Sequence, residues 1–272
     1  MMINDLAFCF NRAFTLAFVR KKIWFVAPFI FLCSILVVAF RLFPYANEWL
    51  SMGFLFLPFI LALSILLSLG VVLIRIYYQE VKRIKAEYKK ILAFSWEILS
   101  GAAYLSVPMI FIYVFLWIIF GFLLLLQEIP LLGPLVASLF SFVSFLLICA
   151  FLTLAIFGIS ALFFAAPVIA LKANLDKSSM MKRVLENFKR NIFVNCLFFF
   201  VGLLPVVSIF FLLFLAAFLT HASYIFFSGN VVYTTISYFF VMIPFSFLIA
   251  PFIVFFFNFA AEGYNYMRKV GI

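Results

Sequence analysis

Residues 134–171 read PLVASLFSFVSFLLICAFLTLAIFGISALFFAAPVIAL, a run of 38 residues without one charged side chain. A run of about 18 or more apolar residues is long enough to cross a bilayer as a helix. As one helix this stretch would be about 57 Å long, against a hydrocarbon core of about 30 Å. The stretch therefore predicts a membrane helix, but one that is longer than the hydrocarbon core is thick.

Two interpretations of 134–171 are open. Two separate segments would need a turn inside 151–160, where only Gly158 favours one, and would move the basic residues that follow to the opposite side. One long helix, tilted or projecting into the cytoplasm, avoids both problems. We predict the single helix, with a kink near Pro167.

Five further apolar stretches lie on either side of this one, at 23–42, 53–78, 102–126, 192–219 and 231–261. The chain is 69% hydrophobic and 10% charged, whereas a soluble domain is about 45–50% apolar and about 25% charged. The prediction is an all-α polytopic membrane protein with six transmembrane helices. We expect one membrane domain over 1–272 and no soluble domain. The stretch at 23–42 is expected to be a retained helix and not a cleaved signal peptide.

The basic residues predict the orientation of the helices. Eighteen of the 19 Lys and Arg residues fall in four islands that lie on one side of the membrane if the chain crosses six times, and only Arg41 lies on the other. The positive-inside rule then places both termini in the cytoplasm. A bacterial inner membrane is the default location, an expectation that rests partly on the family resemblance given below. The net charge of +10 is explained by this pattern, so no nucleic-acid partner is expected.

The order of elements suggests three repeats, at about 4–80, 81–176 and 177–272. Each repeat would have an amphipathic cytoplasmic segment, a span outward and a span back. Leu6, Phe10, Ala13 and Ala17 align in the first segment, with Asp5 as a possible cap. In the second, Val81, Ile84, Tyr88 and Ile91 align, and in the third Met180, Met181, Val184, Leu185 and Phe188.

Basic residues accompany the apolar stripes of these segments. They are consistent with loops that only set topology, or with helices that lie in the membrane interface against anionic headgroups or a protein partner. The candidates for such contact are Lys82, Arg83, Lys85, Lys89, Lys182, Arg183, Lys189 and Arg190.

Residues with catalytic or ligand-binding chemistry are scarce. The sequence shows no Walker or dinucleotide motif, no CxxC pair and a single histidine, His221. Every charge is expected at the end of a span or beyond it, which disfavours ion-coupled transport. We therefore predict no catalytic, cofactor-binding or metal site. Among the polar residues within spans, Ser64, Ser68, Thr153 and Ser160 are expected to bond to their own helix, and Asn195 and Asn258 to hydrogen-bond between helices.

Residues 167–193, PVIALKANLDKSSMMKRVLENFKRNIF, and residues 14–24, FTLAFVRKKIW, carry a family resemblance. The first stretch resembles a pattern in poorly characterised bacterial six-helix proteins, which are similar to the membrane domain of some glycerophosphodiester phosphodiesterases. The acidic residue that often follows the proline in that pattern is absent, and Lys172 stands nearby. The catalytic residues of a phosphodiesterase have no counterpart. The resemblance implies a membrane scaffold.

Two classes of function remain. The first is a non-enzymatic scaffold or accessory subunit of the membrane. The second is a transporter or permease subunit for a hydrophobic or amphipathic solute, since repeats and proline-interrupted helices are common in carriers.

Overall fold

The fold is all-α, as a computed structural model of the chain shows. The structure describes residues 2–41, 48–84, 88–127, 133–171, 192–219 and 231–269. Seven helices lie within these residues: α1 (Met2–Thr15), α2 (Arg20–Arg41), α3 (Glu48–Val81), α4 (Tyr88–Gln127), α5 (Gly133–Leu171), α7 (Ile192–Leu219) and α8 (Val231–Lys269).

Six of these helices, all except α1, are long and apolar enough to cross a membrane. They correspond to the six predicted spans, and they identify the chain as a multi-pass membrane protein. The prediction of one long helix over 134–171 is confirmed, because α5 runs without interruption from Gly133 to Leu171.

The helices differ from the predicted spans mainly in being longer. Helix α4 begins at Tyr88, well before the predicted start at 102, and α8 continues to Lys269 beyond the predicted end at 261. A helix can extend past an apolar stretch because its backbone hydrogen bonds are internal. The extension of α8 matters here because it brings Glu262 onto a membrane helix.

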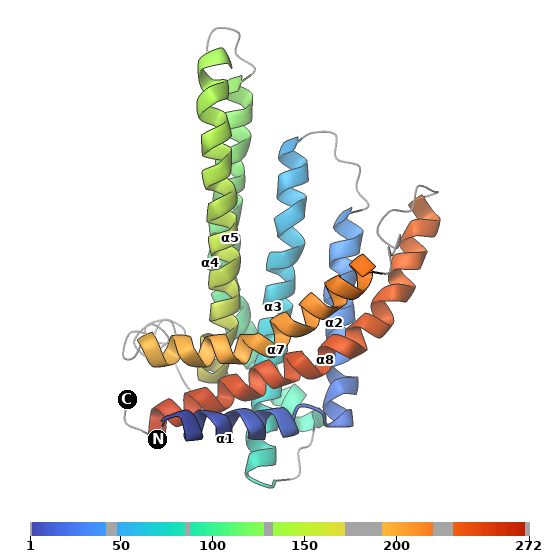
Figure 1. Ribbon diagram of the computed structural model, residues 1–272, viewed down its shortest axis with the longest axis vertical. Helices are drawn as coiled ribbons and strands as arrows, with labels where there is room; N and C mark the ends of the chain where they lie inside the picture. The colour runs from blue at the N-terminus through green and yellow to red at the C-terminus, as the bar shows by residue number, and fades with distance from the viewer. Residues whose placement is uncertain are drawn as a thin grey trace.

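The helices form an elongated bundle with a dense base. Helices α4 and α5 pair as a tall hairpin, α2 and α3 stand beside it, and α1, α7 and part of α8 cross the base at a shallow angle (Figure 1). Helix α8 bends along its course, and Pro244 and Pro251 lie inside it. Proline removes a backbone donor and clashes with the preceding turn, which is a common cause of such bends.

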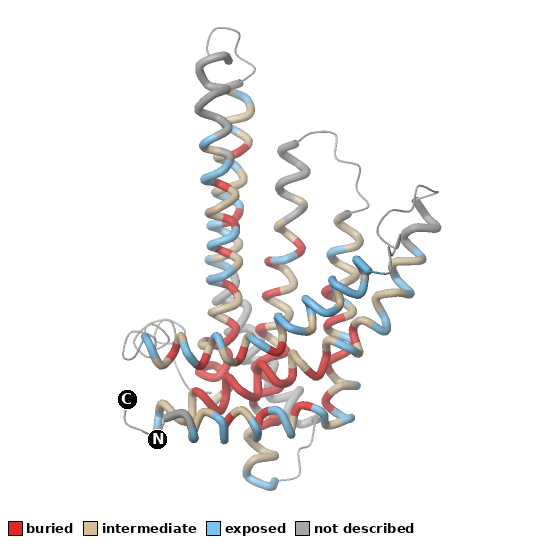
Figure 2. The backbone as a smooth tube through the Cα atoms, in the orientation of Figure 1, coloured by how far each residue is buried: buried red, intermediate tan, exposed pale blue. Residues whose placement is uncertain are grey.

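The buried core lies where α8 crosses α3 and α5, close to the base (Figure 2). Phe163 of α5 and Phe198 of α7 pack there against the aromatic side chains of α8. Away from this crossing, large apolar side chains point outward: Phe193 is 83% exposed and Phe111 is 71% exposed. Surfaces of this kind are stable in lipid and not in water.

Hydroxyl groups within the spans are satisfied locally. Ser64, Ser68, Thr153 and Ser160 each donate a hydrogen bond to the carbonyl oxygen four residues earlier, at 2.7–3.2 Å. The sequence-based prediction for these four residues is confirmed. They serve their own helices, so the polar contacts between helices must come from other residues.

Candidate functional site

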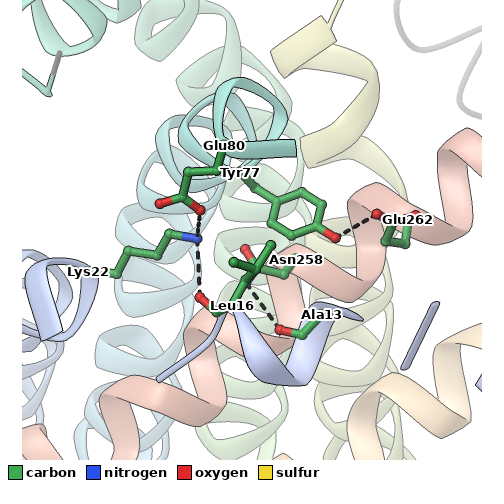
Figure 3. A network of polar contacts seen from close by, with 7 residues as sticks. All are labelled: Ala13, Leu16, Lys22, Tyr77, Glu80, Asn258 and Glu262. Carbon is green, nitrogen blue, oxygen red and sulfur yellow. Dashed lines mark hydrogen bonds and ion pairs between the residues drawn. The ribbon is translucent and has the colours of Figure 1, made fainter. Parts of the chain in front are cut away.

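A chain of buried polar contacts joins α1, α2, α3 and α8 near the base of the bundle (Figure 3). We call it the polar network and define it by the side chains of Arg12, Lys22, Tyr77, Glu80, Asn258 and Glu262, with the carbonyl groups of Ala13 and Leu16. It is the main concentration of interhelical polar contacts in the described part of the chain.

The network begins at the turn between α1 and α2. Helix α1 ends at Thr15, and its last carbonyl groups have no partner within the helix, as at every helix end. The ammonium group of Lys22 donates to the carbonyl oxygen of Leu16 at 3.3 Å, and Nδ2 of Asn258 donates to that of Ala13 at 3.4 Å. A positive charge also suits the negative end of the helix dipole. Side chains of two other helices therefore donate to one carbonyl group at the end of α1 and to one in the turn that follows it.

Lys22 is the central cation of the network. Its side chain is completely buried, forms an ion pair with Glu80 of α3, and has Nζ 5.4 Å from the ring centroid of Tyr77. A buried ammonium ion is expensive unless it is paired. Glu80 supplies the opposite charge and the Tyr77 ring adds a cation–π contact, so the three residues tie the start of α2 to the end of α3.

Glu262 is the central anion. It is only 7% exposed, and Oε1 accepts a hydrogen bond of 2.5 Å from the Tyr77 hydroxyl. The same oxygen lies 3.5 Å from Nη1 of Arg12. Tyr77 thus stands between the two charged pairs: its ring faces Lys22 and its hydroxyl bonds Glu262. The network is continuous from Glu80 to Arg12.

Helix α8 presents its polar groups at a spacing of four residues. Asn258, Glu262 and Tyr266 lie on one face, as residues four apart on a helix do. They contact Ala13, Arg12 and Asp5 of α1 in turn, the last through a 3.3 Å hydrogen bond from the Tyr266 hydroxyl. The order is reversed along α1, so the two helices run antiparallel at this contact.

The position of Glu262 corrects one sequence-based expectation. The sequence predicts every charge at the end of a span or beyond it, and Glu262 follows the predicted span at 231–261. The structure places Glu262 within a helix that could cross the membrane, with its charge directed toward other helices, whereas Lys22 lies in the first turn of α2, at a span end as expected, but is buried. Their position at the edge of apolar stretches concealed this. The available signal was the polar spacing at 258, 262 and 266 in an otherwise apolar region.

The amphipathic segments also differ from expectation. The stripe from Val81 to Ile91 is not one helix, because α3 ends at Val81 and Arg83 has a φ of 57° before α4 begins at Tyr88. In the first segment, Asp5 lies inside the first turns of α1 and bonds Tyr266, so it is not the N-terminal cap. The third segment lies outside the described residues.

The predicted contact residues are located as follows. Lys82 and Arg83 are exposed just after α3, and Nζ of Lys82 lies 4.5 Å from the ring centroid of Tyr78. Lys89 lies on α4, and its side chain is not described. Outside the described residues are Lys85, Lys182, Arg183, Lys189 and Arg190.

Both asparagines singled out from the sequence are buried, Asn195 on α7 and Asn258 on α8. Asn258 makes its interhelical bond to α1, through the carbonyl oxygen of Ala13. Bonding between the two asparagines stays a prediction. Within the described residues, no three His, Cys, Asp or Glu side chains gather as a metal site would require, and all four cysteines are free thiols.

Comparison with known proteins assigns no family. No protein-family model, no curated protein and no solved structure matches this chain. The resemblance to the bacterial six-helix proteins therefore stays a prediction, and the class supported here is a multi-pass helical membrane protein.

Proposed function

We propose that this protein is a non-enzymatic scaffold or accessory subunit of the bacterial inner membrane. The observation that carries the proposal is that the buried charges make contacts between helices. Lys22 and Glu262 each contact side chains of other helices, and together they bind α1, α2, α3 and α8 into one unit. A catalytic residue would instead be directed at a space for substrate.

The proposed orientation has both chain ends on the cytoplasmic side. Exposed bases gather at the base of the bundle, after α3, at the start of α2 and at the end of α8: Arg20, Lys21, Lys82, Arg83 and Arg268. This distribution supports the positive-inside orientation. It also supports anionic headgroups as a partner of Lys82 and Arg83, and we extend that proposal to Lys85, Lys89, Lys182, Arg183, Lys189 and Arg190.

The three-repeat organisation is part of the proposal. The order α1, α2, α3 supports the first unit, 4–80, with its amphipathic segment, span outward and span back. The support for units 81–176 and 177–272 is the pair of long helices in each of them.

Affinity purification from native membranes in a mild detergent, followed by native mass spectrometry, tests the scaffold function. We expect a defined additional mass, either a protein partner or anionic lipid. A bare monomer or homo-oligomer without bound lipid would overturn the proposal. An Arg12→Gln variant is a useful companion, because it weakens the attachment of α1 without changing any span.

A transporter or permease subunit for a hydrophobic or amphipathic solute is the second candidate. It is favoured by proline inside each of the six long helices and by the charges of Lys22 and Glu262 within candidate spans. Intramembrane charges mark ion or substrate pathways in carriers, and proline marks the points at which carrier helices are often broken, although all six long helices are continuous here. Solute flux in proteoliposomes that is abolished by Glu262→Gln would support it, and the absence of flux for a panel of apolar solutes would count against it.

A further inference from the structure

We propose that the α1–α2 turn and the last turn of α3 form a local binding surface for anionic phospholipid, with the phosphate groups held by Arg20, Lys21, Lys82 and Arg83. The proposal rests on the function proposed above and names one part of the surface as the place where anionic lipid binds. This proposal differs from the general one, in which all the basic islands contact anionic lipid equally.

The exposed residues of α1 are uncharged, apart from the Arg12 side chain, which is 36% exposed while it pairs with Glu262. They are Phe8, which is 65% exposed, Phe14, and small or polar uncharged residues, and Phe18 is exposed in the turn that follows. The two charged residues of α1, Asp5 and Arg12, contact Tyr266 and Glu262 of α8. An interfacial helix that binds phosphate through its own side chains has basic residues on its outward face. The face of α1 instead suits the boundary between headgroups and acyl chains.

Trp24, near the start of α2, is a second residue suited to the boundary between headgroups and acyl chains. It is 61% exposed, and its ring packs against Phe247 of α8 in an edge-on geometry with centroids 5.1 Å apart. Tryptophan is enriched where membrane meets water, because its ring is apolar and its N–H needs a polar partner. The protein therefore holds an exposed tryptophan in place against α8, near the start of α2.

The exposed charges of the described residues at the base of the bundle are positive, whereas the buried charges of Lys22 and Glu262 are matched by Glu80 and Arg12. Arg20 and Lys21 are exposed one turn before Trp24, and Lys82 and Arg83 are exposed after α3. The ion pair between Lys22 and Glu80 joins the start of α2, which carries the first pair of bases, to the last turn of α3, which precedes the second pair. Among the described residues, the acids of α1 and of the polar network, Asp5, Glu80 and Glu262, are engaged by Tyr266, Lys22 and Tyr77. The exposed bases are therefore left for a partner with negative charge.

A lipid with a phosphate and no compensating cation, such as phosphatidylglycerol, fits this surface. Its acyl chains would lie beside the phenylalanines of α1 and its phosphate between the two pairs of bases. Each basic residue near an anionic membrane contributes about 1 kcal/mol, which corresponds to about a fivefold change in binding.

Quenching of Trp24 fluorescence by brominated lipid tests the proposal. The full chain carries Trp49→Phe, Trp96→Phe and Trp117→Phe, so that Trp24 is the one remaining tryptophan. It is reconstituted in phosphatidylcholine vesicles with a minor fraction of phosphatidylglycerol, and the bromine is placed on one lipid or the other. We expect stronger quenching by brominated phosphatidylglycerol than by brominated phosphatidylcholine at the same fraction, and stronger quenching by bromine near the headgroup than by bromine deep in the chain.

A variant with Arg20→Gln, Lys21→Gln, Lys82→Gln and Arg83→Gln should lose the preference for phosphatidylglycerol, by about fivefold for each base. The matched control changes Lys182, Arg183, Lys189 and Arg190 to Gln and should leave the preference at Trp24 unchanged. Equal loss in the control would overturn the local site and leave the general proposal of lipid contact standing. Equal quenching by both lipids in the parent protein would also overturn it. Both leaflets have the same composition, so the result does not depend on the proposed orientation.

Discussion

The hydroxyl oxygen of Tyr77 lies 2.5 Å from Oε1 of Glu262, although the two residues are 185 positions apart in the chain. This contact joins α3 to α8, and the ring of the same tyrosine faces the ammonium group of Lys22 on α2. One side chain thus contacts both of the buried charges that the scaffold proposal depends on. A substitution that removes the Tyr77 hydroxyl and keeps the ring separates the roles of these two groups.

Tyr77→Phe should destabilise the bundle by about 1–2 kcal/mol, because Glu262 loses a buried donor while the ring over Lys22 is kept. Unfolding in mixed micelles, followed by circular dichroism, measures the change. Tyr78→Phe is the matched control, since the Tyr78 ring lies under Lys82 near the end of α3 and phenylalanine preserves it. Equal losses in the two variants would show that the Tyr77–Glu262 bond is not a stabilising contact.

Lys22→Met should destabilise the protein by about 3 kcal/mol, because it leaves the Glu80 carboxylate without its counter-ion. The value lies at the lower end of the range for a buried pair, since the Glu80 side chain is 20% exposed and water screens it in part.

The double variant Lys22→Met with Glu80→Gln should recover most of that loss. Lys21→Met, which removes an exposed base one position earlier, should have little effect on unfolding. A double variant no more stable than Lys22→Met would mean that Lys22 acts through its contact with Leu16 or Tyr77 and not through the ion pair.

The six spans are predictable because their signal is local: each is a stretch of apolar side chains longer than a bilayer requires. The polar network is not predictable in the same way. Lys22 and Glu262 stand at the ends of apolar stretches, where bases and acids ordinarily face water, and their burial depends on partners far along the chain. The break at Arg83 within the predicted stripe from Val81 to Ile91 was missed for a different reason, because arginine is not a residue that the left-handed conformation favours.

Gly70→Ala should destabilise the contact between α3 and α8. A Cβ atom at this position would overlap the ring of Phe257, which is itself fully buried. Overpacking of this kind costs about 1–3 kcal/mol, and it opposes the gain of up to about 1 kcal/mol that alanine brings to a helix. Thermal unfolding of the detergent-solubilised protein measures the net change.

Gly158→Ala on α5 is the control for that substitution. Its Cβ would meet the end of the Leu63 side chain, which can rotate away more easily than a buried ring. Phe257→Leu combined with Gly70→Ala should restore part of the loss by making room for the methyl group. A Gly70→Ala protein as stable as the parent would show that α3 and α8 separate freely at this crossing.

Arg83→Gly should stabilise the end of α3 by up to about 1 kcal/mol. The amide groups of Arg83 and Ile84 donate to the carbonyl oxygens of Glu80 and Gln79 at 2.9 and 3.0 Å, the pattern of a Schellman cap, and Arg83 adopts a φ of 57° to make it. Glycine adopts this conformation without the steric cost that a Cβ atom imposes. Arg83→Gln removes the charge and keeps that cost, so its unfolding should match the parent. A rise in stability for Arg83→Gln equal to that for Arg83→Gly would locate the effect in the charge of the exposed bases and not in the backbone of the cap.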